Sequence, residues 1–218
     1  MFRTSGFSVV FDEEVTGKDF DGDGKPEVVF RTDSGGGMHC CWAYIVFALT
    51  PRPHKLFEIA MDGRVDFKTD KDGRLVIWQR VSGPMEFTSM ARRPFGEKVL
   101  RVRDGKLMDA TAEFCGRILS DEMEDYRADQ QALAPANLKK LEHAGEAGYD
   151  SSDYEEVVSA LESRTIQHVF CRQYGEALKD LNLWPAGKRE IVMKSFAQGI
   201  AQDYPEFAER LQEILNSK

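Results

Sequence analysis

The segment from residue 19 to residue 27 reads D-F-D-G-D-G-K-P-E, and these residue types restrict the local structure more than any other part of the chain. Three carboxylates at alternate positions repel one another unless a cation neutralises them. The two glycines allow the backbone to turn tightly between the carboxylates, including at positive φ. Oxygen ligands at alternate positions suit Ca²⁺, which binds about six to eight oxygens in irregular geometry. The predicted ligands of a calcium ion are the side chains of Asp19, Asp21, Asp23 and Glu27 and the backbone carbonyl of Lys25.

The residues that follow this loop distinguish it from an EF-hand. An EF-hand carries a bidentate Glu at loop position 12, within a helix, whereas position 12 here is Phe30. Pro26 and the following Val28 and Val29 favour a strand. We therefore expect a calcium loop that leads into a sheet. The ion is expected to be structural, because no nucleophile with an adjacent base lies nearby. The alternative is an acidic Asp-Gly turn that binds no metal.

Short alternating segments and regular turns fill the chain up to about residue 110. The turns recur roughly every ten residues, which is typical of an antiparallel meander. Propeller blades, sandwiches and barrels all fit this pattern, but a single calcium loop cannot supply the several blades of a propeller. We therefore expect an antiparallel meander over residues 1–110, as a blade-like sheet or a small barrel. The expected strands cover residues 7–11, 27–31, 41–49, 55–61, 65–69, 75–81, 99–103 and 106–108.

From residue 111 to residue 218 the composition shifts toward Ala, Glu, Leu and Lys, and apolar residues take helical spacing. Ser152 and Glu155 match a capping box, which predicts a helix start. Pro205 at a first helical position predicts the start of the last helix. Strands followed by helices indicate the α+β class, with a C-terminal helical region packed on the β-rich part. Helices are expected within residues 119–150 before a loop at 145–150, from residue 152 to the Trp184-Pro185 break, and over residues 187–202 and 206–215.

The net charge of −8 lies entirely in the second half of the chain. Residues 1–118 contain 18 acidic and 18 basic side chains, whereas residues 119–218 contain 19 acidic and 11 basic ones. This balance argues against nucleic acid as a main partner, because phosphate contacts need Lys and Arg. No run of about 18 apolar residues exists, so no membrane span is expected. The first residues also contain no apolar signal segment.

The four cysteines, Cys40, Cys41, Cys115 and Cys171, match no zinc-binding spacing. Their even number is compatible with two disulfides in an oxidising compartment, and equally with buried free thiols. If disulfides form, the preferred pair is Cys115 with Cys171, which joins the start of the helical part to a later helix. Cys40 and Cys41 would then form a vicinal disulfide, which needs a distorted peptide unit.

Two neighbouring segments resemble sequences found in bacterial proteins. The calcium loop with Val28 and Val29 resembles the loop of FG-GAP/VCBS-type repeats, which form β-propeller blades in many exported bacterial proteins. Residues 36–41, G-G-M-H-C-C, resemble a G-G-x-H-C-C element that follows such a loop in uncharacterised bacterial proteins. Residues 174–178, Y-G-E-A-L, together with Trp184-Pro185, are loosely similar to the helical tail of the same proteins. The resemblance implies Ca²⁺ and a periplasmic or secreted location, and it implies no reaction.

Three functions fit these features. Our leading hypothesis is a calcium-stabilised, non-enzymatic binding or interaction module of the bacterial envelope or secreted space, with an unidentified protein partner. The second is a hydrolase or thiol-dependent enzyme in which His39 and Cys41, on one face of a strand, form the catalytic pair. The third is an acidic inhibitor or immunity-type protein that covers a basic surface of its partner.

Overall fold

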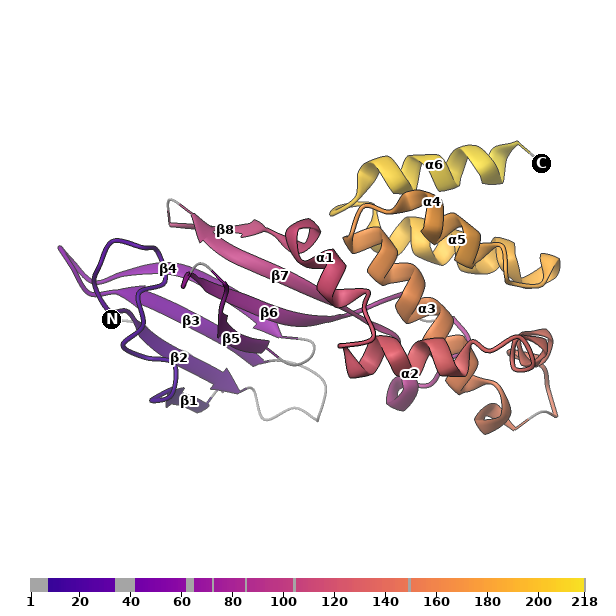
Figure 1. Ribbon diagram of the computed structural model, residues 1–218, viewed down its shortest axis with the longest axis horizontal. Coiled ribbons are helices and arrows are strands. Elements are labelled where there is room, and N and C mark those ends of the chain that lie inside the picture. The colour runs from indigo at the N-terminus through magenta and orange to yellow at the C-terminus, as the bar shows by residue number, and fades with distance from the viewer. Residues whose placement is uncertain are drawn as a thin grey trace. The chain divides into compact units, whose positions relative to one another are not determined.

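The computed structural model divides the chain into two compact units (Figure 1). Unit 1 comprises Met1–Val81 and Lys98–Thr111, and unit 2 comprises Ser82–Glu97 and Ala112–Lys218. None of the described helices combines the length and the hydropathy that a membrane crossing requires. The structure describes residues 8–33, 42–61, 65–71, 73–84, 86–103, 105–148 and 150–217.

Two four-stranded sheets make up most of unit 1, although residue 82 and residues 95–97 of two strands belong to unit 2, and in each sheet the strands follow chain order. The predicted antiparallel meander and the α+β class are confirmed, although the meander is split into two sheets. Among the described strands neither sheet closes into a barrel. The first sheet contains β1 (Ser8–Phe11), β2 (Val28–Asp33), β3 (Trp42–Ala48) and β4 (His54–Met61), and the second contains β5 (Val65–Thr69), β6 (Leu75–Ser82), β7 (Phe95–Arg103) and β8 (Lys106–Asp109).

The hairpin between β5 and β6 shows how local sequence sets a strand end. The Asp70 carboxylate accepts a hydrogen bond from the Arg74 backbone N–H at 2.9 Å, and the Asp70 carbonyl accepts one from Gly73 at 3.1 Å. Gly73 has a φ of +77°, which glycine adopts without steric cost. The turn predicted from the Asp70-to-Gly73 pattern is therefore confirmed, and it holds β5 and β6 in antiparallel register.

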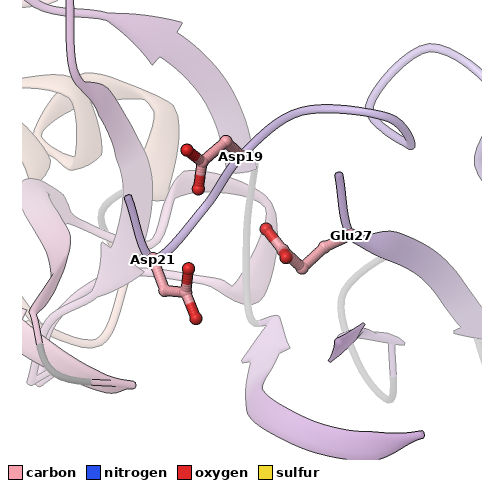
Figure 2. A group of neighbouring side chains, drawn as sticks. All are labelled: Asp19, Asp21 and Glu27. Atoms are coloured by element: carbon pink, nitrogen blue, oxygen red, sulfur yellow. The ribbon is translucent and has the colours of Figure 1, made fainter. Parts of the chain in front are cut away.

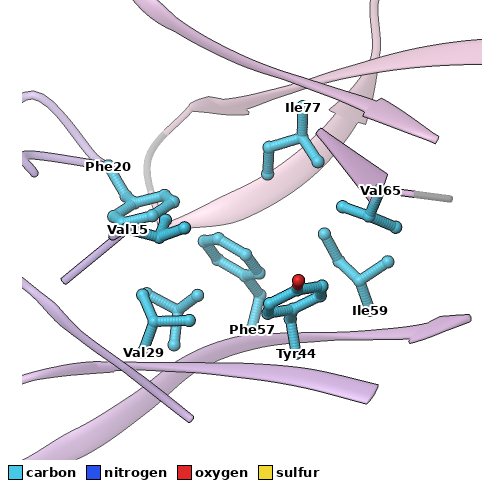
Figure 3. Close-up of a cluster of buried hydrophobic side chains, with 9 residues drawn as sticks. Val15, Phe20, Val29, Tyr44, Phe57, Ile59, Val65 and Ile77 are labelled. Carbon is cyan, nitrogen blue, oxygen red and sulfur yellow. The ribbon is translucent and has the colours of Figure 1, made fainter. Parts of the chain in front are cut away.

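The core of unit 1 is formed by alternate side chains of both sheets and by the loop before β2 (Figure 3). Val15 and Phe20 belong to that loop, and both are less than one-tenth exposed. The Phe20 ring packs edge-to-face against Phe57 and Phe67, with centroid distances of 5.9 and 5.5 Å. Burial of one such side chain stabilises a fold by about 1.5–3 kcal/mol. The loop is therefore anchored in the core. The other buried residues of this core are Val29, Tyr44, Val46, Ile59, Val65 and Ile77.

Helices make up most of unit 2, and α3 is the most extensively buried of them. Residues on several sides of α3 are buried, because α2, α4 and the three short 3-10 helices all contact it. The unit contains η1 (Met90–Arg92), α1 (Thr111–Ile118), α2 (Glu124–Ala132), η2 (Leu138–His143), η3 (Ser151–Asp153), α3 (Glu155–Phe170), α4 (Tyr174–Leu181), α5 (Ala186–Ile200) and α6 (Pro205–Asn216).

The predicted capping box at Ser152 and Glu155 does not form. Ser152 lies in η3, where its backbone N–H donates to the Asp150 carboxylate, and α3 begins at Glu155 without a side-chain cap. The Glu155 carboxylate instead accepts hydrogen bonds from the N–H and hydroxyl of Ser89, at 3.0 and 3.3 Å. Glu155 therefore pairs with Ser89, which is distant in the sequence, instead of with the neighbouring Ser152. Pro205 does occupy the first turn of α6, as predicted.

A close approach at Gly96, in β7, gives a first testable expectation. A Cβ atom at this position would lie 2.5 Å from Ile166 Cγ2 and 2.7 Å from the Phe170 ring. We expect Gly96→Ala to lower the free energy of unfolding by about 1–3 kcal/mol, because a packed core accommodates an added methyl poorly. Urea denaturation measures the difference.

Gly116→Ala is the matched control for this substitution. Gly116 lies in α1 with no atom within 4 Å of an added Cβ. Alanine should be neutral there or stabilise the helix by about 0.5–1 kcal/mol. Equal costs at the two positions would contradict the close packing of Gly96 on α3.

Candidate metal centre

The acidic loop is closed at its base by two backbone hydrogen bonds. The N–H of Gly17 donates to the Glu27 carbonyl at 2.9 Å, and the N–H of Glu27 donates to the Lys18 carbonyl at 3.0 Å. Gly22 and Gly24 both have a φ of +83°, in the left-handed region that favours glycine. These turns reverse the chain between successive carboxylates. The local sequence therefore builds a tight loop directly before β2.

Three carboxylates of this loop lie close together. Oxygen atoms of Asp19, Asp21 and Glu27 are all within 4.8 Å of one another. Figure 2 shows the three side chains directed toward a common space. Asp19 is exposed, Asp21 is half-buried and Glu27 is buried. The structure therefore brings together three of the four side chains that the sequence predicted as ligands.

Backbone N–H groups hold these carboxylates in place. Asp19 accepts hydrogen bonds from Gly22 at 2.7 Å and from Gly24 at 2.9 Å. Glu27 accepts one from the Phe20 N–H at 2.6 Å. A carboxylate has about four lone-pair directions, so each group retains capacity to bind a cation. Hydrogen bonds from the loop backbone thus set the positions of these carboxylate oxygens.

Glu27 has no ion-pair partner among the described residues, and the nearby Lys25 ammonium, which its charge affects, is paired with Asp23 instead. Burial raises the pKa of the Glu27 carboxyl, and the charges of Asp21, Asp19 and Asp23 raise it further, whereas the hydrogen bond from the Phe20 N–H lowers it. Within the described part of the chain, none of the three clustered carboxylates forms an ion pair with Lys or Arg. A buried carboxylate without a partner is costly, and a bound cation would remove that cost.

Asp23, the fourth predicted side-chain ligand, lies outside the group of three. Its carboxylate is 3.0 Å from Lys25 Nζ and accepts the Lys25 backbone N–H at 2.8 Å. These contacts lower the pKa of Asp23, and the same pair raises the pKa of Lys25. Both side chains are exposed, so this ion pair contributes little to stability. Coordination by Asp23 and by the Lys25 carbonyl stays a prediction.

The cysteines divide between described and undescribed parts of the chain. Cys115 in α1 and Cys171, directly after α3, form the disulfide that the sequence favoured, with their Sγ atoms 2.01 Å apart. His39, Cys40 and Cys41 lie outside the described residues, so the proposed His39–Cys41 catalytic pair and a Cys40–Cys41 disulfide both stay predictions.

Sequence reasoning missed a buried ionic cluster in unit 2. Asp180 of α4 is only 4% exposed, and it accepts hydrogen bonds from Arg164 Nη2 at 2.6 Å and His168 Nδ1 at 2.7 Å. Arg164 and His168 are one turn apart on α3, which is the only local signal of the cluster. Its third member comes from another helix, so the spacing alone could not reveal it. The cluster joins α3 to α4.

The expected resemblance to FG-GAP/VCBS-type loops depends on a few residues around the acidic loop, and the described strands of unit 1 form two open sheets and no propeller. We compared the chain with protein-family models, with curated proteins and with solved structures, and none of the three comparisons gave a match.

Proposed function

We propose that the loop from residue 19 to residue 27 binds a structural calcium ion and that the protein is a non-enzymatic binding module. The observation that carries this proposal is the convergence of Asp19, Asp21 and Glu27 within 4.8 Å, without a basic partner among the described residues. The location we propose is the bacterial periplasm or the secreted space, and the partner we propose is another protein.

The donor set favours a hard cation. The three clustered groups offer oxygen atoms alone, and carboxylate oxygens suit Ca²⁺ and Mg²⁺ better than the softer transition metals. Ca²⁺ accepts irregular geometry and a variable number of oxygens, whereas Mg²⁺ demands a near-ideal octahedron. The exposed side of Asp19 leaves room for water ligands. This loop, with its ligands fixed by backbone turns, therefore fits Ca²⁺ best.

Phe20 would couple calcium binding to folding. Phe20 lies between two of the clustered carboxylates, its N–H donates to Glu27, and its ring is 3% exposed in the core of unit 1. An ion that holds the loop together also holds this ring between the two sheets. Binding to the folded state alone stabilises a protein by mass action. The role supported by this arrangement is stabilisation rather than catalysis.

An aromatic row on the outer face of the first sheet supports a binding role. The rings of Phe11, Phe30 and Phe47 follow one another across β1, β2 and β3 in edge-to-face contacts, each with a centroid distance of 5.9 Å. These residues alternate with the buried Val29 and Val46, so they lie on the face opposite the core. Phe11 is 46% exposed. Apolar surface of this kind is typical of interaction sites.

The disulfide supports the proposed location. Structural disulfides form and persist in oxidising compartments, and they are rare in the reducing cytosol of mesophiles. The bond between Cys115 and Cys171 therefore agrees with the periplasmic or secreted location that the loop resemblance implies.

Thermal unfolding in Ca²⁺ and in chelator tests the metal proposal. We expect Ca²⁺ at about 100 times its Kd to raise the free energy of unfolding by about 2.7 kcal/mol. Mg²⁺ at the same concentration should have a smaller effect. Differential scanning calorimetry in the presence of Ca²⁺, Mg²⁺ or EGTA measures the change.

Glu27→Gln makes the test specific, because glutamine keeps the size of the side chain and removes its charge. In EGTA this variant should be at least as stable as the wild type, since the repulsion from Asp19 and Asp21 is relieved. In Ca²⁺ it should gain little. Asp12→Asn, in the connection between β1 and β2 but outside the carboxylate group, should respond to Ca²⁺ as the wild type does. A wild-type melting temperature that is identical in Ca²⁺ and EGTA would refute the site.

A further inference from the structure

The connection between β6 and β7 lies along one face of α3. At its start, a Cβ atom on Gly83 would lie 2.1 Å from Ile166 Cδ1, so the backbone there touches the helix. Further along, the N–H and hydroxyl of Ser89 donate to the Glu155 carboxylate. The Gly83 N–H also donates to the Pro94 carbonyl at 2.9 Å, which closes the base of the connection. The connection therefore contacts α3 at the first residue of the helix, Glu155, and again three turns later at Ile166.

Glu162 lies between these two contact points. Glu155, Glu162 and Ile166 are separated by seven and four residues, an interval that returns to the same face of a helix. Glu162 is 1% exposed, and neither of its carboxylate oxygens has a hydrogen-bond partner of normal geometry among the described residues. Glu86 is the charged residue of the connection that acts on it.

No positive charge compensates Glu162 in the described structure. The helices that contact α3 are α2, α4, η1, η2 and η3, and none of their described charged groups acts on this carboxyl. Burial and, to a smaller extent, the charge of Glu86 raise the pKa of Glu162 to about 8, although the backbone N–H of Glu86 acts in the opposite direction. An ionised carboxylate at this position would be buried without a counter-charge, which is strongly unfavourable. The carboxyl is therefore neutral while the connection covers it.

We propose that Glu162 is a pH-sensitive latch, whose neutral carboxyl lets residues 83–84 and 86–89 lie on α3 and whose ionisation releases them. The step is a proton transfer from the Glu162 carboxyl to solvent, so no other reactant is needed. Release would expose the carboxylate to water and remove the cost of its burial. The inference is independent of the calcium proposal, since all of its residues belong to unit 2.

The direction of the pH effect follows from proton linkage. The carboxyl titrates at about 8 in the folded protein and near its ordinary value of 4.5 in the unfolded chain. Between these values the folded state binds the extra proton, so the free energy of unfolding falls as the pH rises. The stabilisation is complete below 4.5 and lost as the pH passes through about 8. Opening of the connection offers a local way to ionise Glu162 without unfolding the whole unit.

Trp184 reports whether the connection is in place. Its ring packs against Phe87, with a centroid distance of 5.6 Å, and it is 1% exposed. The protein contains three tryptophans, so fluorine NMR of protein labelled with 5-fluorotryptophan gives three signals. Trp42→Phe and Trp78→Phe assign the remaining signal to Trp184. We expect this signal to shift with a midpoint near pH 8, while far-UV circular dichroism stays constant.

Two variants separate the latch from general alkaline unfolding. In Glu162→Gln the Trp184 signal should stay constant from below to above pH 8, because glutamine does not ionise. Glu86→Gln changes an exposed side chain, so it should fold normally, and it should move the midpoint to lower pH. The latch is refuted by a constant Trp184 signal in the wild type, by a wild-type midpoint in either variant, or by a parallel loss of helical dichroism.

Discussion

Replacing both Cys115 and Cys171 with alanine is expected to lower the free energy of unfolding by about 4 kcal/mol. The disulfide closes a loop with a sequence separation of 56 residues, and a cross-link of this length removes conformational entropy from the unfolded chain. Urea denaturation of the variant and the wild type, both without reductant, measures the loss. A cost of this size is a large part of the stability of a typical domain.

The single variants provide the control for this expectation. Cys115→Ala and Cys171→Ala each break the same bond, so each should cost nearly as much as the double variant. Costs of the single variants that simply add would show that no bond joins the two residues. Labelling of either cysteine by a thiol reagent in the unreduced wild type would lead to the same conclusion, because a cysteine in a disulfide has no free thiol to react.

The disulfide also belongs to a larger buried contact. Gln167 Nε2 lies 3.8 Å from Cys171 Sγ and donates to the Glu97 carbonyl at 3.1 Å. Gln167 Oε1 accepts the Glu97 N–H at 2.7 Å. One side chain of α3 therefore satisfies both backbone groups of a residue at the start of β7. Loss of the bond should loosen this contact, which hydrogen exchange of the Glu97 amide would detect.

Phe20→Ala is expected to cost about 3–5 kcal/mol and also to weaken the stabilisation by Ca²⁺. The ring is almost fully buried between Phe57 and Phe67, and its removal leaves a cavity between the two sheets. The same change frees the backbone between Asp19 and Asp21, so the carboxylates lose their fixed positions. Urea denaturation in Ca²⁺ and in EGTA measures both effects.

Phe11→Ala is the matched control, since its ring is 46% exposed on the outer face of the first sheet. Its cost should stay below about 1 kcal/mol, the range of a cross-strand contact, and its response to Ca²⁺ should equal that of the wild type. Similar costs for the two phenylalanines would contradict the anchoring of the loop. If Phe20→Ala lowers the free energy of unfolding by about 3–5 kcal/mol but leaves the response to Ca²⁺ unchanged, the metal site does not depend on the burial of this ring.

Where local sequence carries the signal, the predicted elements agree closely with the structure. The expected strand over residues 65–69 coincides with β5, and the one over residues 75–81 differs from β6 by one residue. The last two helices are placed to within two residues at either end. These elements depend on features that span only a few residues: alternating apolar and polar side chains, Asp-Gly turns, and a proline in the first helical turn. Such features can be recognised without knowledge of the fold.

The first residue of β7, in contrast, could not be predicted from the local sequence. The expected strand began at residue 99, whereas β7 begins at Phe95. The N–H of Phe95 donates to the hydroxyl of Ser163 at 3.1 Å, and the backbone of Glu97 pairs with Gln167. Partners about 70 positions away in the sequence thus support this part of the strand. Nothing in the local pattern of residues 95–98 could indicate them.

The sequence by itself predicted that Asp19, Asp21 and Glu27 come together, because glycines and alternate acidic residues lie within nine positions of one another. The burial of Phe20 in the core then fixes their positions. Tertiary structure alone decided the state of Glu162 and the partners of Asp180. The protonation state of a carboxyl group depends on its desolvation and on the charged groups nearby. Elements distant in the sequence control both quantities, so no spacing rule can supply them.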